Sequence, residues 1–252
     1  MAVIKSVVAE LGIQSEVHEG LVIGHSEVVA QACVPGTSIL RISVIATWAD
    51  VIAGIIAGHA INPRIPLTLD LEVHIINPAR VGMRISSEAI PVKVGRTVTV
   101  CEATFRDEQS GEPLAVSICS FIASPDPSHV FPGGFPLLEG MNQRLTQPLA
   151  ERIGSRTIGP GMVEVPHRPD GLNASGAIQG GLVAFAAEEA ALSLREEPAI
   201  VDSLNVRYLR PFSTGPARAV ASCDGDTSIV RLTDVGAGKL GAIATVRLGR
   251  LR

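Results

Sequence analysis

Residues 67–75, LTLDLEVHI, alternate strictly between hydrophobic and polar side chains. A period of two places the hydrophobic residues on one face, so this segment is predicted to be a half-buried β-strand. The preceding residues 42–60 differ, because they are almost entirely apolar and carry Asp50 as a single formal charge. A helix that is apolar all round must be buried on nearly all sides. The pattern therefore predicts a long central helix with a sheet wrapped around it.

This unit of a helix followed by a strand occurs twice. The strand before Pro211 alternates in the same manner as the strand before Pro78, and Gly82 recurs as Gly215, with a constant offset of 133 positions. Each strand also follows an apolar helix with one central acid. The two acids are Asp50 and Glu188. Such self-similarity indicates a tandem repeat.

The remaining hydrophobic segments predict a sheet in each half. Further strands, bounded by turn residues, are expected at 83–92, 97–105, 114–122, 217–223, 228–233 and 239–248. A segment rich in Pro and Gly, SPDPSHVFPGGFP, has the composition of a linker. We therefore expect an N-terminal domain of residues 1–124, an exposed linker of residues 125–136 that limited proteolysis cuts first, and a C-terminal domain of residues 137–252. A short helix over 137–153 should open the second domain.

Composition narrows the class of protein. The 252 residues are 46% hydrophobic and 18% charged with a net charge of −4, which gives no basic footprint for nucleic acid or an anionic membrane. Cysteines and histidines are scattered without a CxxC pair or the spacing of a metal site. The N-terminus lacks the features of a signal peptide, and Asp50 lies where a membrane-spanning helix tolerates charge least. We expect a cytoplasmic protein that spans no membrane.

The start of the second predicted helix contains an unusual pair of glycines. Residues 173–181 read NASGAIQGG, so Gly180 and Gly181 fall where the first helical turn should be. Two glycines there cost about 2 kcal/mol relative to alanine, which calls for a compensating benefit. Amides at a helix start lack an intrahelical partner and favour negative charge. A glycine would let a ligand approach such an N–H closely, although a glycine pair also allows close packing of helix on sheet.

These residues resemble the helix start of the phenylacetate-degradation type of hotdog acyl-CoA thioesterase. That family's motif is N-x-x-G-x-x-[HQ]-G-G, with an Asp or Glu seven residues after the second glycine, and this chain has Asn173 and Glu188 in that register. A Ser or Thr ten residues before the strand-ending proline completes the family pattern, and Thr68 meets it in the first half. The resemblance covers most of both halves and is weakest in the first 35 residues and the last strands.

The resemblance implies an α+β fold of two hotdog units, each a long central helix wrapped by an antiparallel β-sheet. It implies hydrolysis of an acyl-CoA thioester to the free acid and CoA, without a metal and without a cofactor beyond the CoA of the substrate. The Gly180 N–H would stabilise the oxyanion, helped by the Asn173 amide, because a fixed donor favours the charge that develops in the transition state. The expected partner is a small-molecule acyl-CoA.

Helix geometry decides which acid serves Gly180. Glu188 lies eight residues further along the same helix, about 12 Å away along its axis, which is too far to act on the same carbon. In hotdog dimers the site lies between two units, one providing the helix start and the other the carboxylate. The two halves of this chain would therefore form a pseudo-dimer, and assembly into a homo-oligomer would also fit the family.

The two sites of such a pseudo-dimer are not equally complete. The first half has lost the polar groups of the helix start, and the second half has lost the strand hydroxyl. With the central acids and the strands aligned, the replacements are Ile42 for Gly180, Pro35 for Asn173 and Val201 for Thr68. One composite site keeps its full set of candidate catalytic residues. These are Asp50 and Thr68 from the first half with Asn173 and Gly180 from the second.

Several roles remain open at the level of sequence. Asp50 would act as general base on water or attack the thioester to form an anhydride, although a buried helix acid can also be structural. Thr68 would orient the water or the carboxylate, or simply favour a strand. Glu188 is either a relic or has a secondary function. Arg96, in a predicted turn, would bind a CoA phosphate or remain a solvated surface charge.

Two other functions fit the same fold. A non-catalytic acyl or acyl-CoA binding module would explain the loss of half of the catalytic set, but the complete remaining set argues against it. A double-hotdog hydratase or dehydratase would need an Asp/His pair in a short loop, and the nearest histidine downstream of Asp50 is His59. Hydrolysis of an acyl-CoA is therefore the leading hypothesis.

Overall fold

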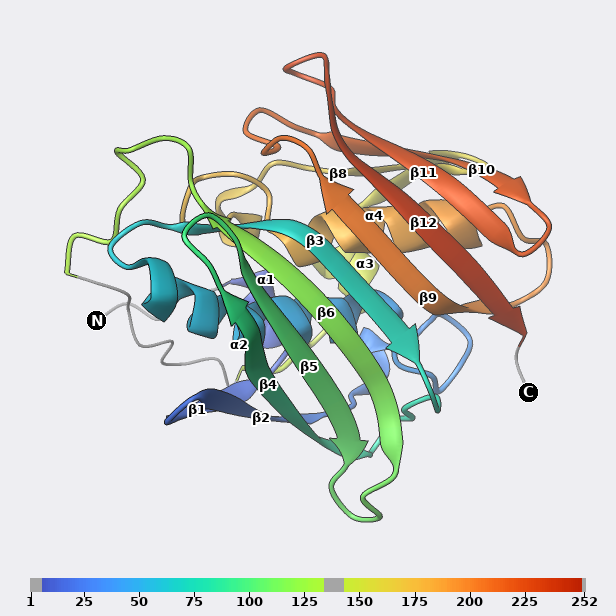
Figure 1. Ribbon diagram of the computed structural model, residues 1–252. Helices are drawn as coiled ribbons and strands as arrows, with labels where there is room; N and C mark the ends of the chain where they lie inside the picture. Colours follow the sequence, from blue (N-terminus) through green and yellow to red (C-terminus); the bar gives the residue numbers. More distant parts are fainter. Residues whose placement is uncertain (1–5, 134–142, 251–252) are drawn as a thin grey trace.

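The computed structural model describes residues 6–133 and 143–250, and these residues form one antiparallel sheet of 12 strands with helices on one of its faces (Figure 1). The elements of the first half are α1 (Val7–Glu10), β1 (Gln14–His18), β2 (Leu21–Glu27), α2 (Ile42–Ile61), β3 (Pro66–Ile75), β4 (Arg84–Val94), β5 (Thr99–Asp107) and β6 (Pro113–Ala123). The elements of the second half are α3 (Leu149–Ile153), β7 (Arg156–Gly159), β8 (Met162–Val165), α4 (Gly180–Leu192), β9 (Ala199–Tyr208), β10 (Ala217–Asp224), β11 (Thr227–Asp234) and β12 (Lys239–Arg250). Short 3₁₀ turns at Ala30–Ala32 and Pro169–Gly171 precede α2 and α4.

The order of strands across the sheet mirrors the repeat in the sequence. It runs β1-β2-β4-β5-β6-β3-β9-β12-β11-β10-β8-β7, so both halves contribute the same arrangement and meet at β3 and β9. At this junction Leu71 pairs with Val206 in an antiparallel register, and an ion pair joins Asp70 to Arg207. The two halves thus share one continuous sheet.

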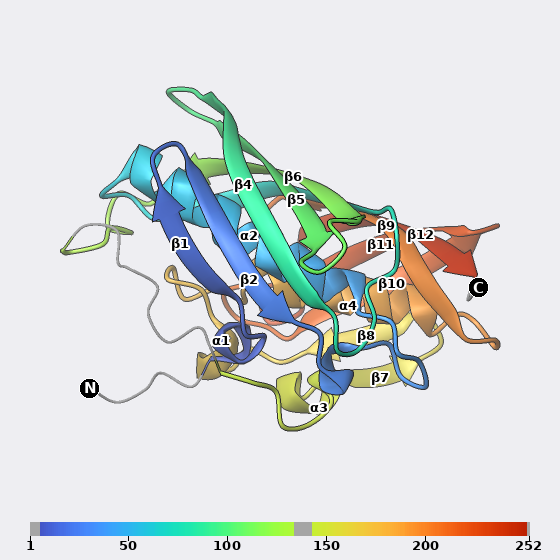
Figure 2. The same ribbon diagram turned by 90° about the horizontal axis from the view of Figure 1, so that it is seen from below.

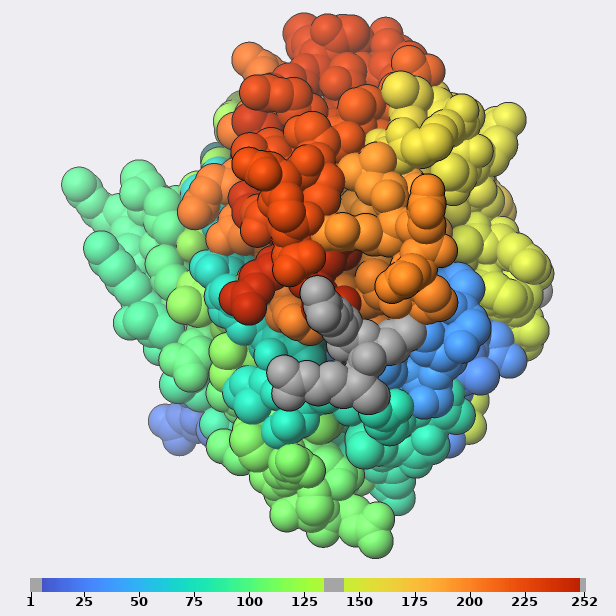
Figure 3. Space-filling view, turned by 90° about the vertical axis from the view of Figure 1, so that its right-hand side faces the viewer, coloured from blue at the N-terminus to red at the C-terminus, as the bar shows by residue number. Residues whose placement is uncertain are grey.

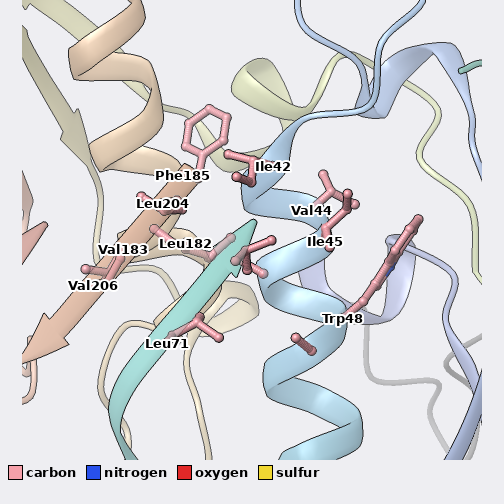
Figure 4. Close-up of a cluster of buried hydrophobic side chains, with 14 of the residues drawn as sticks. Ile42, Val44, Ile45, Trp48, Leu71, Leu182, Val183, Phe185, Leu204 and Val206 are labelled. Carbon is pink, nitrogen blue, oxygen red and sulfur yellow. The ribbon is translucent and has the colours of Figure 1, made fainter. Parts of the chain in front are cut away.

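Helices α2 and α4 pack against each other on the same face of the sheet (Figures 1 and 2). Buried side chains from both helices and both junction strands form one core, in which Phe185 of α4 lies beside Ile42 at the start of α2 (Figure 4). Helix α2 is long and apolar enough to cross a membrane, but in this structure it is the core helix, with most of its residues buried. The apolar run in the sequence is therefore explained by the sheet that wraps around it.

Every strand expected from the sequence is present, with ends that differ by a few residues. The structure adds β1 and β2 at one edge and β7 and β8 at the other. Their hydrophobic signal is weak: the buried face of β2 carries Val22, Gly24 and Ser26, and β1 is largely exposed. Edge strands of this kind give little alternation to detect.

The helix expected over 137–153 is wrong in its length. Only Leu149–Ile153 is helical, residues 143–148 are not, and residues 137–142 lie outside the described residues. Pro148 explains the late start, because proline disfavours helical backbone in the residue before it and suits the first turn of a helix.

The segment between the halves runs along the end of α2. Residues 125–128 are exposed, and residues 134–136 of the expected linker lie outside the described residues. The N–H of Phe131 donates to the Pro63 carbonyl at 2.8 Å, and Arg64 donates to the Asp126 carbonyl at 3.2 Å. These contacts bring Phe131 to the hollow described below.

Candidate active site

Gln179 caps the first turn of α4. Its side-chain Oε1 accepts hydrogen bonds from the N–H groups of Gly181 at 2.6 Å and Leu182 at 3.3 Å. The N–H of Gly180 has no acceptor among the residues that the structure describes. It therefore keeps the partial positive charge of a helix start, available to a ligand.

The carboxylate of Asp50 lies opposite this helix start. Thr68 donates its hydroxyl to Oδ1 at 2.7 Å, and Gln179 donates Nε2 to Oδ2 at 2.8 Å. Thr68 belongs to the first half and Gln179 to the second, so Asp50 is held across the junction. Burial raises the pKa of Asp50 to about 6, and the hydrogen bond from Thr68 opposes that rise. The carboxylate is thus oriented, ionised at neutral pH and more basic than usual.

The two glycines have different neighbours. A Cβ atom added to Gly181 would lie 2.7 Å from the Cβ of Thr47, so this glycine permits close packing of α4 on α2. The contact is helix on helix, and not the helix on sheet contact considered from the sequence. A Cβ added to Gly180 would enter the space between the Tyr208 hydroxyl, at 3.3 Å, and Asp50 Oδ2, at 3.4 Å. The missing side chain at Gly180 therefore keeps a gap beside the carboxylate.

Tyr208 is a site residue that the sequence reasoning missed, because it treated the residue only as a buried position of a strand. From the end of β9 its hydroxyl donates to the Gly180 carbonyl at 2.8 Å. Burial raises the pKa of this phenol well above its usual value, so it remains a neutral donor. A signal was available: Tyr208 is the only tyrosine of the chain, and its counterpart in the first half is Ile75.

Asn173 organises the loop that leads into α4. Its Oδ1 accepts hydrogen bonds from the Ser175 N–H at 2.9 Å, the Ser175 hydroxyl at 2.7 Å and the Ala177 N–H at 3.2 Å. Its Nδ2 has no acceptor within the described segments. Because Asn173 lines the hollow beside Asp50, Nδ2 is the group that remains to donate to a ligand.

Two adjoining hollows open on this cluster. The larger, of about 280 Å³, includes Asp50 and continues along α2. The smaller, of about 130 Å³, includes Tyr208 and the residues that follow β9. The residues that line both are Leu67, Thr68, Asn173 and Gly180. The helix start and the strand hydroxyl therefore mark the boundary between two mostly apolar compartments.

Glu188 lies at the start of the other helix. It is fully buried, and its carboxylate accepts the N–H groups of Ile42 at 3.2 Å and Ser43 at 3.3 Å together with the Ser43 hydroxyl. Arg41 Nη1 is 3.9 Å from its Oε2. Burial raises the pKa of Glu188, and the charge of Arg41 opposes that rise. The Glu188 carboxylate therefore takes up the N–H donors at the start of α2 itself. We call this region, Arg41 to Ser43 with Glu188, the closed end.

Arg41 completes the closed end. It directly precedes α2, as Gln179 directly precedes α4. Its Nη1 is 2.6 Å from Glu189 Oε1, and its guanidinium lies over the Phe185 ring at 5.1 Å. With Arg41 at 1% and Glu188 at 0% exposure, no substrate reaches this acid in the structure.

The loops before the two helices differ by one residue, which corrects the alignment made from the sequence. The N–H of Val34 donates to the Ile39 carbonyl, just as the N–H of Asn173 donates to the Ala177 carbonyl. The counterpart of Asn173 is therefore Val34 and not Pro35. A gap-free alignment from the central acids could not show the additional residue.

Arg96 lies apart from the candidate site. It is exposed in the turn between β4 and β5 and lines neither hollow. Arg210 does line the smaller hollow, where it donates to the Leu240 carbonyl at 3.3 Å. Within residues 6–133 and 143–250, no group of three or more His, Cys, Asp or Glu side chains is arranged to hold a metal ion.

A hollow of about 690 Å³ lies at the other end of the junction, lined by Ile75 and Ile200 among others. Ile75 is the counterpart of Tyr208, so this hollow is equivalent in position to the smaller compartment of the Asp50 site. Figure 3 views this side of the molecule, where blue and teal residues of the first half meet orange and red residues of the second. Glu188 does not line it. Size alone therefore does not identify the site, and we place it where an acid meets an unpaired helix-start N–H.

Comparison by sequence points to one superfamily. A family model described as the thioesterase superfamily matches residues 43–114, a segment that contains Asp50 and Thr68. The matched segment is less than half of the chain. No protein of curated function matches the sequence.

Comparison of structures covers the whole chain. A putative thioesterase II from Thermobifida fusca YX is similar over 99% of this chain and 100% of its own, with a TM-score of 0.61 and 18% identity. The tesB protein of Mycobacterium avium subs paratuberculosis is similar over 96% and 97%, with a TM-score of 0.61 and 16% identity. The 12:0-ACP thioesterase from Umbellularia californica is similar over 93% and 99%, with a TM-score of 0.65 and 10% identity. This chain therefore has the hotdog fold of thioesterases over its full length.

Proposed function

We propose that the protein hydrolyses acyl-CoA thioesters at one composite site, formed by Asp50 and Thr68 of the first half with Asn173 and Gly180 of the second. One observation carries this proposal: an oriented, partly buried carboxylate meets an unpaired helix-start N–H at a mostly apolar hollow. Thioester hydrolysis needs both, a base or nucleophile for the acyl carbon and a fixed donor for the oxyanion. It requires no cofactor besides the CoA of the substrate.

In this proposal the thioester oxygen binds the N–H of Gly180, with Nδ2 of Asn173 as a second donor. The acyl carbon then lies beside Asp50, in the gap that a side chain at position 180 would occupy. Asp50 either takes a proton from the attacking water or attacks the carbon itself, and the CoA thiolate leaves and is protonated by solvent. Thr68 fixes the carboxylate in both cases, because its hydroxyl donates to Oδ1.

Single turnover in heavy-oxygen water separates the two roles of Asp50. If Asp50 attacks, water opens the resulting anhydride and the label enters the protein carboxylate or the product acid. If Asp50 acts as a base, the label enters the product acid alone. Label in the Asp50 peptide after one turnover, read by mass spectrometry, shows attack by Asp50, because the base route breaks no bond of this carboxylate. If the label is in the product acid alone, trapping with hydroxylamine separates the two roles, because only the anhydride converts Asp50 or the acyl group to a hydroxamate without CoA-bound substrate remaining.

The carrier in this proposal is CoA. The smaller compartment has mostly apolar walls that suit a pantetheine arm, and Arg210 at its edge offers a charge for a phosphate. Arg96 remains a second candidate for such a contact. An acyl carrier protein, the carrier named for the Umbellularia californica enzyme, presents the same pantetheine group. It is therefore tested separately as an alternative carrier.

The deciding experiment follows thiol release from short, medium, aromatic and long acyl-CoAs and from the matching acyl carrier proteins. Hydrolysis of an acyl-CoA that is lost in Asp50→Asn supports the proposal. Preference for the carrier-protein substrate overturns the choice of CoA. Tight binding of acyl-CoA without hydrolysis overturns catalysis and favours the binding-module alternative.

A further inference from the structure

The hollow beside Asp50 continues along one side of α2. The helix residues that line it are Val51, Gly54 and Ile55, and Phe131 lines it from the segment after β6. Among the described residues that line it, Asp50 alone carries a formal charge. This compartment can therefore receive an apolar group attached to a carbon that Asp50 and Gly180 contact.

Gly54 interrupts α2 without a need from the backbone or from packing. Glycine is a poor helix former, and Gly54 is not one of the glycines with a positive φ. Beyond its chain neighbours and the adjacent backbone of α2, an added Cβ would have Cε1 of Phe121, at 3.8 Å, as its sole neighbour within 4 Å among the described residues, an ordinary van der Waals distance. Gly181 is different, because Thr47 leaves no room for a side chain there. The absence of a side chain at Gly54 thus leaves space in the hollow.

The second half fills the equivalent space. Leu192 lies at the same distance from the start of α4 as Gly54 does from the start of α2. It packs against the buried cluster Val34, Ile39 and Ile200. The counterparts of that cluster, by loop hydrogen bonds and strand offset, are Asn173, Ala177 and Leu67. These three residues line the compartments of the Asp50 site. The two halves therefore share one framework, and the space that is open beside Gly54 is occupied by the Leu192 side chain in the second half.

We propose that Gly54 creates the acyl pocket of this protein, and that the acyl group is an uncharged apolar chain lying along α2 between Gly54 and Phe131. This inference rests on the proposed thioester hydrolysis. The pocket of about 280 Å³ lies just below the roughly 300–1,000 Å³ of typical small-molecule sites, which suits a short or medium chain. A charged acyl group is disfavoured, because none of the described residues that line the far wall carries a charge to pair with it.

The test copies into the first half what the second half already contains. Gly54→Leu should lower kcat/KM for octanoyl- and decanoyl-CoA by at least ~10-fold, the scale on which apolar pockets discriminate a few methylenes. The value for acetyl-CoA should change by less than about twofold, because the acetyl group does not reach Gly54. An equal loss for all chains, or an unchanged chain-length profile, would overturn the inference.

Two further variants control for folding and for general packing. Gly54→Ala adds one methyl group and should lower activity with decanoyl-CoA alone, while its Tm stays at or above that of the wild type. If Gly54→Leu does not fold, the result for Gly54→Ala decides between the outcomes. Leu192→Ala enlarges the equivalent space in the second half and should leave the chain-length profile unchanged. A change of profile in Leu192→Ala would move the acyl pocket to the other half.

Binding without turnover separates this inference from the proposed function. The probe is a fluorescent conjugated fatty acid, titrated into the wild type and Gly54→Leu. Should the wild type hydrolyse no thioester, the proposed function fails, yet at least ~10-fold weaker binding in Gly54→Leu still supports an apolar pocket at Gly54. Equal binding by both proteins overturns the pocket, whatever the hydrolysis assay shows.

Discussion

The two central helices begin in opposite ways although the framework around them is the same. At the start of α4, Gly180 leaves its N–H unpaired beside Asp50 and a hollow. At the start of α2, the carboxylate of Glu188 accepts the N–H groups of Ile42 and Ser43 and is fully buried. The N–H donor at the start of α4 is thus available to a ligand, whereas the N–H donors at the start of α2 are bonded to a side chain of the protein itself.

The length of the acid explains part of this difference. Glu188 has one more methylene than Asp50, and it reaches the opposite helix start directly. Asp50 is instead held by Thr68 and Gln179, and the Gly180 N–H remains without a partner in the described chain. An acid that faces a helix start thus stabilises the fold when it caps that start, and can serve chemistry when it stops short of it.

The largest expected effect is on turnover at the Asp50 site. Asp50→Asn keeps the shape of the side chain but removes its ability to take a proton or attack, so kcat should fall by at least ~10²-fold, the usual scale for such groups. The measurement is steady-state hydrolysis of the best acyl-CoA after circular dichroism has confirmed folding. Glu188→Gln should retain most of its activity. If Glu188→Gln is inactive and Asp50→Asn active, the comparison is reversed.

The same two variants should rank the other way in stability, with Glu188→Gln as the less stable protein. Glu188→Gln removes a fully buried charge beside Arg41 and should cost about 3 kcal/mol. For a chain of this size that is a fall in Tm of roughly 6–12 °C. Differential scanning calorimetry of both variants measures this, and an unchanged Tm would mean that the closed end contributes little to stability.

The neighbouring glycines should also separate into a functional and a structural one. Gly180→Ala places a methyl group in the gap between Tyr208 and Asp50 and should lower kcat/KM by at least ~10-fold, since small displacements at a reacting centre are costly. Gly181→Ala should mainly destabilise the fold, by about 1–3 kcal/mol, because Thr47 blocks the new methyl group.

A second-site change tests the structural half of that prediction. Thr47→Gly removes the Cβ that lies 2.7 Å from the new methyl group, so Gly181→Ala should cost less stability in the Thr47→Gly background than in the wild type, measured by urea unfolding. Thr47→Gly should not restore activity to Gly180→Ala. Rescue of Gly180→Ala by Thr47→Gly would show that both glycines serve the same helix contact.

The smallest expected effect concerns pH. Because the pKa of Asp50 is raised to about 6 and the ionised form is the reactive one, kcat/KM should fall below about pH 6. Thr68→Val removes the hydrogen bond that lowers this pKa, so the acid limb should move to higher pH. Profiles of kcat/KM against pH for both proteins measure the shift, and a limb that stays in place would separate Thr68 from the titrating group.

The same shift makes a statement about stability. The folded pKa of Asp50 is above its ordinary value of 3.8, so the fold favours the protonated form. This contribution to stability is complete below about pH 4 and is lost as the pH rises through about 6. In Asp50→Asn the corresponding slope in the free energy of unfolding should be absent.

Elements whose burial is reflected in their own pattern of hydrophobic and polar residues could be predicted from the sequence. The strand over 67–75 alternates because one face is buried, and α2 is apolar all round because the sheet and α4 cover it. The edge strands β1 and β7 were missed because exposed short strands carry little pattern. The expected helix over 137–153 failed at Pro148, where a local restriction outweighed the surrounding propensity.

The candidate site could be predicted only in part. Asp50, Thr68 and Gly180 were paired by comparing the halves, and the structure brings them together. Tyr208 was missed, because its contact with the Gly180 carbonyl depends on how β9 ends against α4. Arg96 was included because it lies in a turn after a strand, but this turn, between β4 and β5, lies outside both hollows.

The sequence by itself determined the repeat, the two apolar helices, the paired glycines and which half retains which polar groups, because these are properties of residue type and spacing. Only the tertiary structure decided that Gly181 serves a helix contact while Gly180 faces a gap, and that Glu188 caps the helix opposite. It also decided that Gly54 borders a hollow, whereas its counterpart Leu192 packs against buried side chains. These outcomes depend on distances between segments far apart in the chain. Periodicity along one segment does not contain such distances, because they are set by the packing of both halves on one sheet.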